Sequence, residues 1–263
     1  MNKALWIARA KELGIDELEI YELLSAKRSL SWYEGKLDSF TTSRVLGTAL
    51  RAVAGGKQAE MALEQADDEK MDDILASLKE QAEIVGSKDP AALRAPEETE
   101  IAVSKKHFVT PSVPEIQALM DKVEKDLLAA DPRIVQVGSV EWEEESEIRM
   151  ITNSLGLAIE EKSRYQILSA EAAAKEGDEV KTDYKVEVVE NLADFDEDEF
   201  VKKLSENLIG KLGGKSLPTG RYKVILEKDA MTSLFMAMSG MFSGEMINRG
   251  ISPLAKKTGE KIF

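Results

Sequence analysis

The sequence contains no cysteine and a single histidine, His107, among its 263 residues. Without cysteine the chain forms no disulfide and offers no thiolate as a metal ligand or nucleophile. A Ser–His catalytic arrangement or a zinc site would have to use His107, and no second histidine exists to complete the usual nitrogen and sulfur shell of zinc. Because His107 lies in the proline-rich stretch 86–114, an incidental loop histidine is the stronger interpretation.

Basic charge and long apolar runs are also scarce. The formal net charge is −14, and the densest basic runs are two lysines long, so we expect no nucleic-acid partner. No apolar run approaches the roughly 20 residues that cross a bilayer, which predicts no membrane span. The start of the chain, "MNKALWIARAKELG", lacks the apolar core and cleavage site of a signal peptide. A cytoplasmic location is the expectation.

The residues present show clear periodicities. Apolar residues at helical spacing predict helices over 3–13 and 69–85. Between them the period changes to two, and the turn signals "EGK" and "GG" predict an antiparallel meander over 17–63. A long connection follows at 86–114, where four prolines interrupt any regular pattern.

A second set of elements follows this connection. "SVPE" is a capping box, with Ser112 as N-cap and Glu115 at N3, and Pro132 ends the helix that it opens. "DFDEDEF" places acidic side chains at the start of a further helix, where they suit the helix dipole. Between the two helices, strand patterns occur at Val135/Val137, Val140/Trp142, Ile148/Met150 and Tyr184/Val186/Val188.

The order helix, meander, helix therefore occurs twice, which predicts an α+β fold. We expect residues 1–213 to form one domain, with structural repeats over 1–86 and 112–213. The sequence "GGKSLPTG", 213–220, is typical of a linker. Beyond it a short strand, Tyr222–Leu226, and a methionine-rich helix predict that 214–263 is the incomplete start of a second, strand-rich domain.

Three acidic clusters are candidates for acid–base or cation sites: 67–73, 141–147 and 196–199. Each is placed by the patterns at a turn or helix start, where solvated charge is the simpler interpretation. "GKLGGKS", 210–216, misses the phosphate-loop spacing by one residue and follows a helix rather than a strand. A helix end and linker explain it better.

The methionine-rich stretch "SLFMAMSGMFSGEMINRG", 233–250, allows three interpretations: a working site, a packing helix, or the place of a lost site. Read as a helix, it has a stripe of small residues and is apolar over much of the rest, which is typical of a buried helix. Methionine also suits adaptable interfaces. Its composition alone supports only packing.

Several segments resemble the TldD/PmbA family, whose PmbA-type members are also called TldE. "SFTTSRVLGTALRAVAGGKQ", 39–58, is similar to the family's first strand block, and "TNSLGL", 152–157, to its Asn-Ser-x-Gly turn. The best match, "TGRYKVILEKDAMTSLFMAMSGMFSGEMINRGISPLAKKTGEKIF", begins at Thr219. Family members continue past "GEKIF" into a strand-rich C-terminal domain, so the resemblance implies either a truncated version or a sequence from which the rest of the gene product is absent.

The resemblance implies a heteromeric zinc peptidase whose TldD-type chains carry the motif H-E-x-x-x-H. Two histidines of such a motif ligate zinc, and the glutamate acts on the bound water. Aligned on "NRG", the motif's histidine, glutamate and second histidine fall on Phe235, Met236 and Gly240, and none of these binds zinc. We therefore expect no catalytic residue and no cofactor in this chain, with zinc in a TldD-like partner.

The function implied is that of a PmbA/TldE-like, metal-free subunit of a cytoplasmic peptidase complex acting on small or unfolded peptides. Strand edges and the segment Asn248, Arg249 and Gly250 are the candidates for contact with peptide, by addition of a strand. The alternative is a non-enzymatic peptide-binding or scaffold module that self-associates as a homo-oligomer through the methionine-rich helix. A third interpretation, an independent hydrolase, would need a site built from carboxylates alone.

Overall fold

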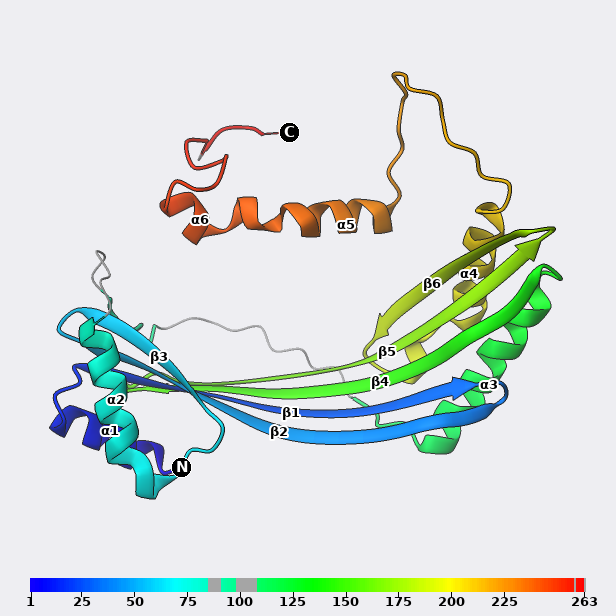
Figure 1. Ribbon diagram of the computed structural model, residues 1–263. Coiled ribbons are helices and arrows are strands. Elements are labelled where there is room, and N and C mark those ends of the chain that lie inside the picture. The colour runs from blue at the N-terminus through cyan, green and yellow to red at the C-terminus, as the bar shows by residue number, and fades with distance from the viewer. Residues whose placement is uncertain (85–90, 98–107, 258, 263) are drawn as a thin grey trace. The chain divides into compact units, whose positions relative to one another are not determined.

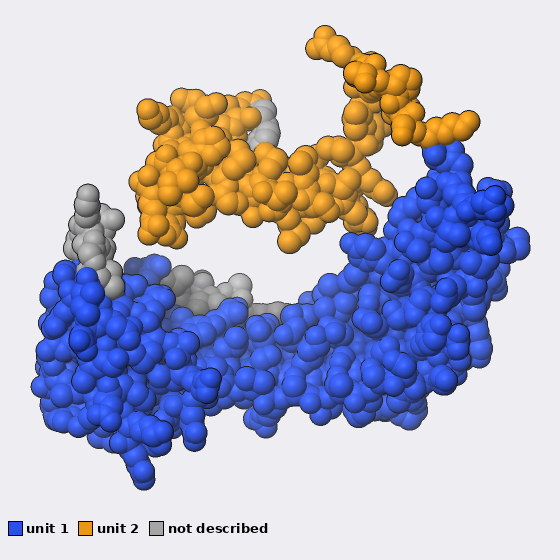
Figure 2. All heavy atoms as spheres, viewed as in Figure 1, with its two compact units in different colours: residues 1–214 blue, residues 215–263 orange. Residues whose placement is uncertain are grey.

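The computed structural model describes residues 1–84, 91–97, 108–257 and 259–262, and the chain divides into two compact units, Met1–Gly214 and Lys215–Phe263 (Figure 2). The α+β class is confirmed. The first unit contains α1 (Lys3–Glu12), β1 (Glu17–Tyr33), β2 (Lys36–Ala54), β3 (Lys57–Leu63), η1 (Asp68–Lys70), α2 (Met71–Ile84), α3 (Val113–Ala130), β4 (Ile134–Asn153), β5 (Ala158–Glu176), β6 (Glu179–Val189), η2 (Leu192–Asp194) and α4 (Glu197–Gly210). The second contains α5 (Lys228–Met238), η3 (Ser239–Phe242) and α6 (Gly244–Asn248).

The strands of the first unit form one curled antiparallel sheet in the order β3-β2-β1-β4-β5-β6 (Figure 1). Each meander contributes three consecutive strands, and β1 pairs with β4 from Glu19↔Asn153 to Trp32↔Val140. This central pairing joins the two meanders into a single sheet. The order helix, three strands, helix occurs on both sides of it.

The long helices of this unit pack on one face of the sheet. In β1, Leu18 and Ile20 belong to the core under α1 and α2, while Leu30 belongs to the core under α3 and α4. These positions are all even, and side chains of alternate strand residues share a face. None of the four long helices of this unit lies on the opposite face, where the odd-numbered side chains of β1 lie.

Two separate cores stabilise the two ends of the sheet. Trp6, Leu75 and Leu78 are fully buried in one, and Trp142 and Phe200 in the other. Burial of side chains of this size contributes about 1.5–3 kcal/mol each. Between the two cores, the side chains of β1 from residue 23 to residue 29 are only partly buried, on both faces of the sheet.

The predicted capping box of α3 is confirmed. The Glu115 N–H donates to Ser112 Oγ at 3.4 Å, and the Ser112 N–H donates to Glu115 Oε2 at 2.7 Å. The Ser112 hydroxyl also donates to Glu115 Oε2 at 2.7 Å. This bond and the bond from the Ser112 N–H hold the pKa of Glu115 below its usual value, because both favour the carboxylate. The same contacts give hydrogen-bond partners to the N–H groups of Ser112 and Glu115, which a helix start otherwise leaves to water.

Three sequence expectations are corrected. The separate patterns between Val135 and Met150 belong to one strand, β4, and the pattern analysis assigned no strand to residues 158–176, which form β5. The alanines of β5 favour a helix, but pairing on both sides along 166–174 outweighs that preference. Tyr222–Leu226 forms no strand, because an extended segment needs a hydrogen-bonded neighbour and none lies beside it among the described residues.

The turn between α3 and β4 predicts that the stability of the fold decreases at low pH. The Arg133 guanidinium and the Arg133 N–H bond Asp131, which lowers the pKa of that carboxyl to about 2. A carboxyl whose pKa is depressed on folding stabilises the fold above its unfolded pKa, about 3.9, and loses this contribution as pH falls towards 2.

We therefore expect Asp131→Asn to be less stable than the parent chain at pH 7 and equally stable near pH 2. Urea midpoints measured at both pH values check this result. A difference that persists unchanged at the lower pH would show that the Asp131 carboxylate is not responsible.

Candidate functional site

The methionine-rich stretch does not form one continuous helix. α5 ends at Met238, the turn η3 follows, and Ser243 begins α6 as its N-cap, accepting from the Met246 N–H at 3.4 Å. Glycines at 240 and 244 favour the interruption, since glycine in a helix costs up to about 1 kcal/mol relative to alanine. The small-residue stripe predicted for a single helix is therefore divided between separate elements.

The three positions expected to replace a zinc motif lie on α5 and η3. Phe235 and Met236 are on α5, with 46% and 73% of their surfaces exposed, and Gly240 is in η3. An aromatic ring, a thioether and a bare backbone provide no imidazole or carboxylate, so these positions do not fit a hydrolytic zinc ion. Within the described parts of the chain, no three His, Cys, Asp or Glu residues are close enough to hold a metal.

Asn248, Arg249 and Gly250 are exposed and lie together at the end of α6. The Arg249 guanidinium pairs with Glu245 one turn earlier at 3.0 Å. Gly250 has a φ of 71°, the left-handed conformation that commonly ends a helix, and the Ser252 N–H donates back to Met246 O at 3.0 Å. Helix termination therefore accounts for the glycine without any ligand.

The second unit exposes apolar side chains that the sequence pattern predicts to be buried. No residue of α5 is buried, which corrects the expectation of a packed helix. A helix buries its apolar face only if a partner surface is present, and contiguous exposed apolar surface marks such interaction sites. The exposed large apolar residues of this unit are Leu217, Tyr222, Val224, Ile225, Leu226, Leu234, Phe235, Met236, Phe242, Met246, Ile251 and Ile262.

The acidic cluster 141–147 lies in the middle of β4, not at a turn as predicted. Glu143 pairs with Lys27 at 2.8 Å, and the Tyr165 hydroxyl donates to Glu145 at 2.6 Å. This bond and burial raise the pKa of Tyr165 to about 12. Each of these two carboxylates is therefore bound by a neighbouring side chain, and the arrangement does not resemble an acid–base pair.

On the helix side of the same strand, Glu144 is nearly buried between two arginines that the sequence analysis missed. Glu144 accepts from Arg28 at 3.1 Å and from Arg164. Arg28 also donates to Pro111 O at 2.9 Å, and Arg164 bonds the Thr110 hydroxyl. These contacts fix residues 110–111 to the sheet, and no sequence spacing could have indicated them because the partners are 20 to 116 residues apart.

The other acidic clusters lie where the sequence analysis placed them. Asp68, in η1, accepts from the Trp6 indole at 2.6 Å, which lowers the pKa of Asp68. Asp196 caps α4 by accepting from the Glu199 N–H. Gly210 is the last residue of α4, and residues 211–216 follow it without helix or strand, as a helix end and linker would. His107 lies outside the described residues.

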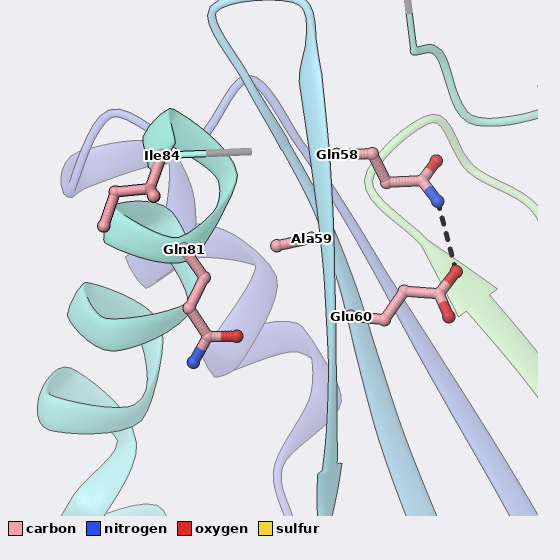
Figure 3. Close-up of a pocket in the computed structure, with 5 residues that line it drawn as sticks. All are labelled: Gln58, Ala59, Glu60, Gln81 and Ile84. Atoms are coloured by element: carbon pink, nitrogen blue, oxygen red, sulfur yellow. Dashed lines mark hydrogen bonds between the residues drawn. The ribbon is translucent and has the colours of Figure 1, made fainter. Parts of the chain in front are cut away.

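A hollow of about 470 Å³ lies at the edge of the sheet, beside β3 and α2 (Figure 3). Ala59 points towards α2, whereas Gln58 and Glu60 point to the other side of β3, where they bond each other at 3.1 Å. The polar groups therefore do not converge on one enclosed point. None of the predicted site residues lies here, and the hollow shows no catalytic arrangement.

Comparisons with known proteins place the chain among metallopeptidase relatives. Residues 106–212 match the PmbA/TldA metallopeptidase central domain, and residues 219–263 match the PmbA/TldA metallopeptidase C-terminal domain. No match was found among the curated proteins. None of the described helices is long and apolar enough to pass through a bilayer.

Three solved structures are similar to the chain. One, from Thermotoga maritima and provisionally described as a modulator of a DNA gyrase, is 25% identical with a TM-score of 0.82, covering 98% of this chain and 59% of that one. A second protein of that description, from Bacteroides thetaiotaomicron, is 17% identical with a TM-score of 0.85, covering 98% and 60%. TldE from Thermococcus kodakarensis is 16% identical with a TM-score of 0.77, covering 96% and 57%. The chain thus spans about three fifths of the length of these structures.

Proposed function

The chain belongs to the PmbA/TldD metallopeptidase family, and from that premise we propose that it is a TldE-like subunit of a peptidase complex. In this proposal a TldD-type partner holds the zinc ion, and this chain shapes the chamber in which small or unfolded peptides are cut. We place the complex in the cytoplasm. The fold shared with TldE supports the assignment at the level of architecture.

One observation carries the proposal: the residues at the aligned motif positions. Phe235, Met236 and Gly240 stand where the family resemblance places the histidine, glutamate and histidine of H-E-x-x-x-H. Zinc hydrolysis needs ligands that bind the ion and a base that activates its water. The residues at these three positions can neither ligate zinc nor activate its water, so in this proposal another chain supplies the zinc site.

The experiment is to express the chain with a TldD-type protein and to purify the two by a tag on this chain alone. We expect the partner to co-purify, zinc to follow the amount of partner, and chelator-sensitive peptide cleavage to require both. Changing the partner's motif glutamate to glutamine should lower cleavage about 10²-fold or more, the scale expected for loss of a general base. Chelator-sensitive cleavage by the purified chain alone would contradict the proposal.

Within this function, Asn248, Arg249 and Gly250 are proposed to contact the peptide. Their exposure supports the idea, since all three are accessible at the end of α6. Crosslinking from a photoreactive peptide should mark residues 248–250 in the complex, and Lys256 and Lys257, exposed nearby in sequence, provide comparison positions. A crosslinking map without contact at 248–250 would remove this assignment and leave the subunit role intact.

A second candidate function is a non-enzymatic scaffold that self-associates through the second unit. The exposed side chains of Leu234, Met236 and Phe242 favour it, because apolar surface of this kind gains free energy when covered. Failure of any TldD-type chain to co-purify would make this scaffold the better account.

We also propose that residues 1–213 and 214–263 are separate domains, and that 112–213 is an internal duplication of 1–86.

A further inference from the structure

The outer strand β6 pairs with β5 on one side, and among the described residues no strand pairs with its other edge. β5 and β6 are joined by the two-residue turn Gly177–Asp178 and pair from Glu176↔Glu179 to Gln166↔Val189. In such a hairpin the residues flanking the turn bond each other, and every second residue after them also faces the neighbour. The backbone N–H and C=O groups of the alternate residues therefore point away from β5, at Val180, Thr182, Tyr184, Val186 and Val188.

The side chains of these residues lie on the face of the sheet opposite α4 and are exposed. The exposed fractions are 56% for Val180, 72% for Tyr184, 49% for Val186 and 62% for Val188. Four large apolar side chains in one row on an open edge are unusual, since edge strands are normally short or protected by charge. This row indicates a surface that pairs with another strand.

The opposite face of β6 carries a regular alternation of charge. Glu179, Lys181, Asp183, Lys185 and Glu187 alternate in sign and are half-buried towards α4. Asp183 pairs with Lys211 at 2.8 Å, and Lys185 lies 5.7 Å from the centre of the Phe200 ring. An alternating strand of this kind is complementary to a second copy of itself in selected registers only.

We propose that β6 pairs antiparallel with β6 of a second copy of this chain, with Tyr184 opposite Tyr184 at the two-fold axis. In this register Thr182 lies opposite Val186 and Val180 opposite Val188, so all five outward-facing residues enter the ladder. Lys181 then lies opposite Glu187, and Asp183 opposite Lys185. Opposite charges directly across a strand pair are favourable, and a two-fold interface closes the assembly at two copies.

Other registers are less favourable. Centring the pair on Asp183 would place Asp183 opposite itself, Lys181 opposite Lys185, and Glu179 opposite Glu187, which repels at every charged position. Centring it on Thr182 keeps opposite charges but moves Val186 and Val188 beyond the paired strand. The charge pattern therefore selects the register centred on Tyr184, and this pairing is independent of the proposed peptidase role.

Two contacts at the edge must be replaced on pairing, one of them the bond from the Tyr184 N–H to Asp183 Oδ1 at 3.0 Å. The Lys211 ammonium donates to Thr182 O at 3.1 Å, one of the outward-facing carbonyl groups. A lysine that covers an edge carbonyl weakens strand addition, as lysines on edge strands generally do. Lys211→Met should therefore strengthen dimer formation, and an unchanged dissociation constant would show that this carbonyl does not take part.

The decisive experiment exchanges charges at Lys181 and Glu187, and it measures the dimer dissociation constant by sedimentation of the full chain. Lys181→Glu places like charges across the axis at two positions, as does Glu187→Lys, and each should weaken the dimer about tenfold. Mixing these two variants should restore the affinity, because both cross-chain pairs in the mixed dimer are again of opposite sign. Recovery in the mixture is a result that a folding defect in either chain cannot produce.

A backbone variant tests the ladder itself. Tyr184→Pro removes an outward N–H at the centre of the pairing, which in the monomer donates to the Asp183 carboxylate at 3.0 Å. It removes no bond to β5, so the monomer should fold and the dimer should be lost. Thr42→Pro is the matched control, because Thr42 pairs with β1 but lies on the part of β2 that β3 does not reach, with its N–H also directed outward. Circular dichroism verifies the fold of both.

Several outcomes would overturn the proposal. The parent chain could remain monomeric at high concentration, the mixed charge variants could fail to associate, or Thr42→Pro rather than Tyr184→Pro could abolish the dimer. Association that needs a foreign peptide or a TldD-type chain at β6 would assign this edge to that partner instead. None of these results bears on whether a TldD-type chain supplies zinc, so the two proposals fail separately.

Discussion

Replacing Phe200 with alanine is expected to lower the free energy of unfolding by about 3–5 kcal/mol, the range for removing a buried phenylalanine. Phe200 is fully buried in the core under α3 and α4, where its ring lies 5.2 Å from that of Phe195 and beneath Lys185. The loss combines the transfer of the ring to water with the cavity that the surrounding side chains leave. Equilibrium unfolding in urea, followed by circular dichroism, measures the change.

Phe40→Ala provides the matched control for this prediction. Phe40 has the same side chain but lies on β2 with 48% of its surface exposed, so its removal should change stability by no more than about 0.5 kcal/mol. Both variants should keep the parent slope of unfolding against urea, since each exposes the same chain. Equal losses in the two variants would show that Phe200 does not pack as described.

Replacing Glu124 with alanine is expected to cost roughly 1–3 kcal/mol, the cost of a buried donor, here the Trp32 indole N–H, left without an acceptor. Glu124 is 6% exposed, and its Oε2 accepts from the Trp32 indole at 3.1 Å and from the Gly35 N–H at 2.8 Å. These bonds attach the tip of the β1–β2 hairpin to α3. Loss of the carboxylate leaves the buried Trp32 indole N–H unpaired, gives the exposed Gly35 N–H to water and frees the hairpin tip.

Glu124→Gln removes the negative charge but keeps a hydrogen-bond acceptor. The glutamine carbonyl can still accept at the position of Oε2, so this variant should lose less than half of what the alanine variant loses. Hydrogen exchange at Gly35 gives a local readout: its amide should exchange faster in the alanine variant and remain protected in the glutamine variant. Equal losses in both variants would assign the effect to the negative charge.

The sequence predicts much of the fold because several signals are local. The capping box at Ser112 and Glu115 requires only four consecutive residues, and the Gly55–Gly56 turn adopts positive φ values that glycine tolerates. The period-two pattern from Glu17 to Leu63 correctly predicts the first meander. The central alanines of β5 do not reveal their strand, because helix preference opposes the pairing that only the neighbouring strands impose.

The candidate site was likewise predictable from the sequence only in part. The sequence alone determines that Phe235, Met236 and Gly240 cannot ligate zinc, since that follows from side-chain chemistry wherever they lie. It does not determine that α5 is exposed, because burial depends on whether a partner surface is present. The helix breaks at Ser239 for local reasons, yet its apolar pattern alone predicts burial.

The sequence by itself determined the chemical inventory, the turns, the caps and the order helix, meander, helix, because each depends on a residue's own chemistry or on near neighbours. Only the tertiary structure decided which face of the sheet the helices of the first unit cover, that Glu144 lies between Arg28 and Arg164, and that β6 exposes its apolar side chains. Those features depend on residues distant in sequence. Pairing of β1 with β4 brings them together, and no short stretch of sequence contains both partners.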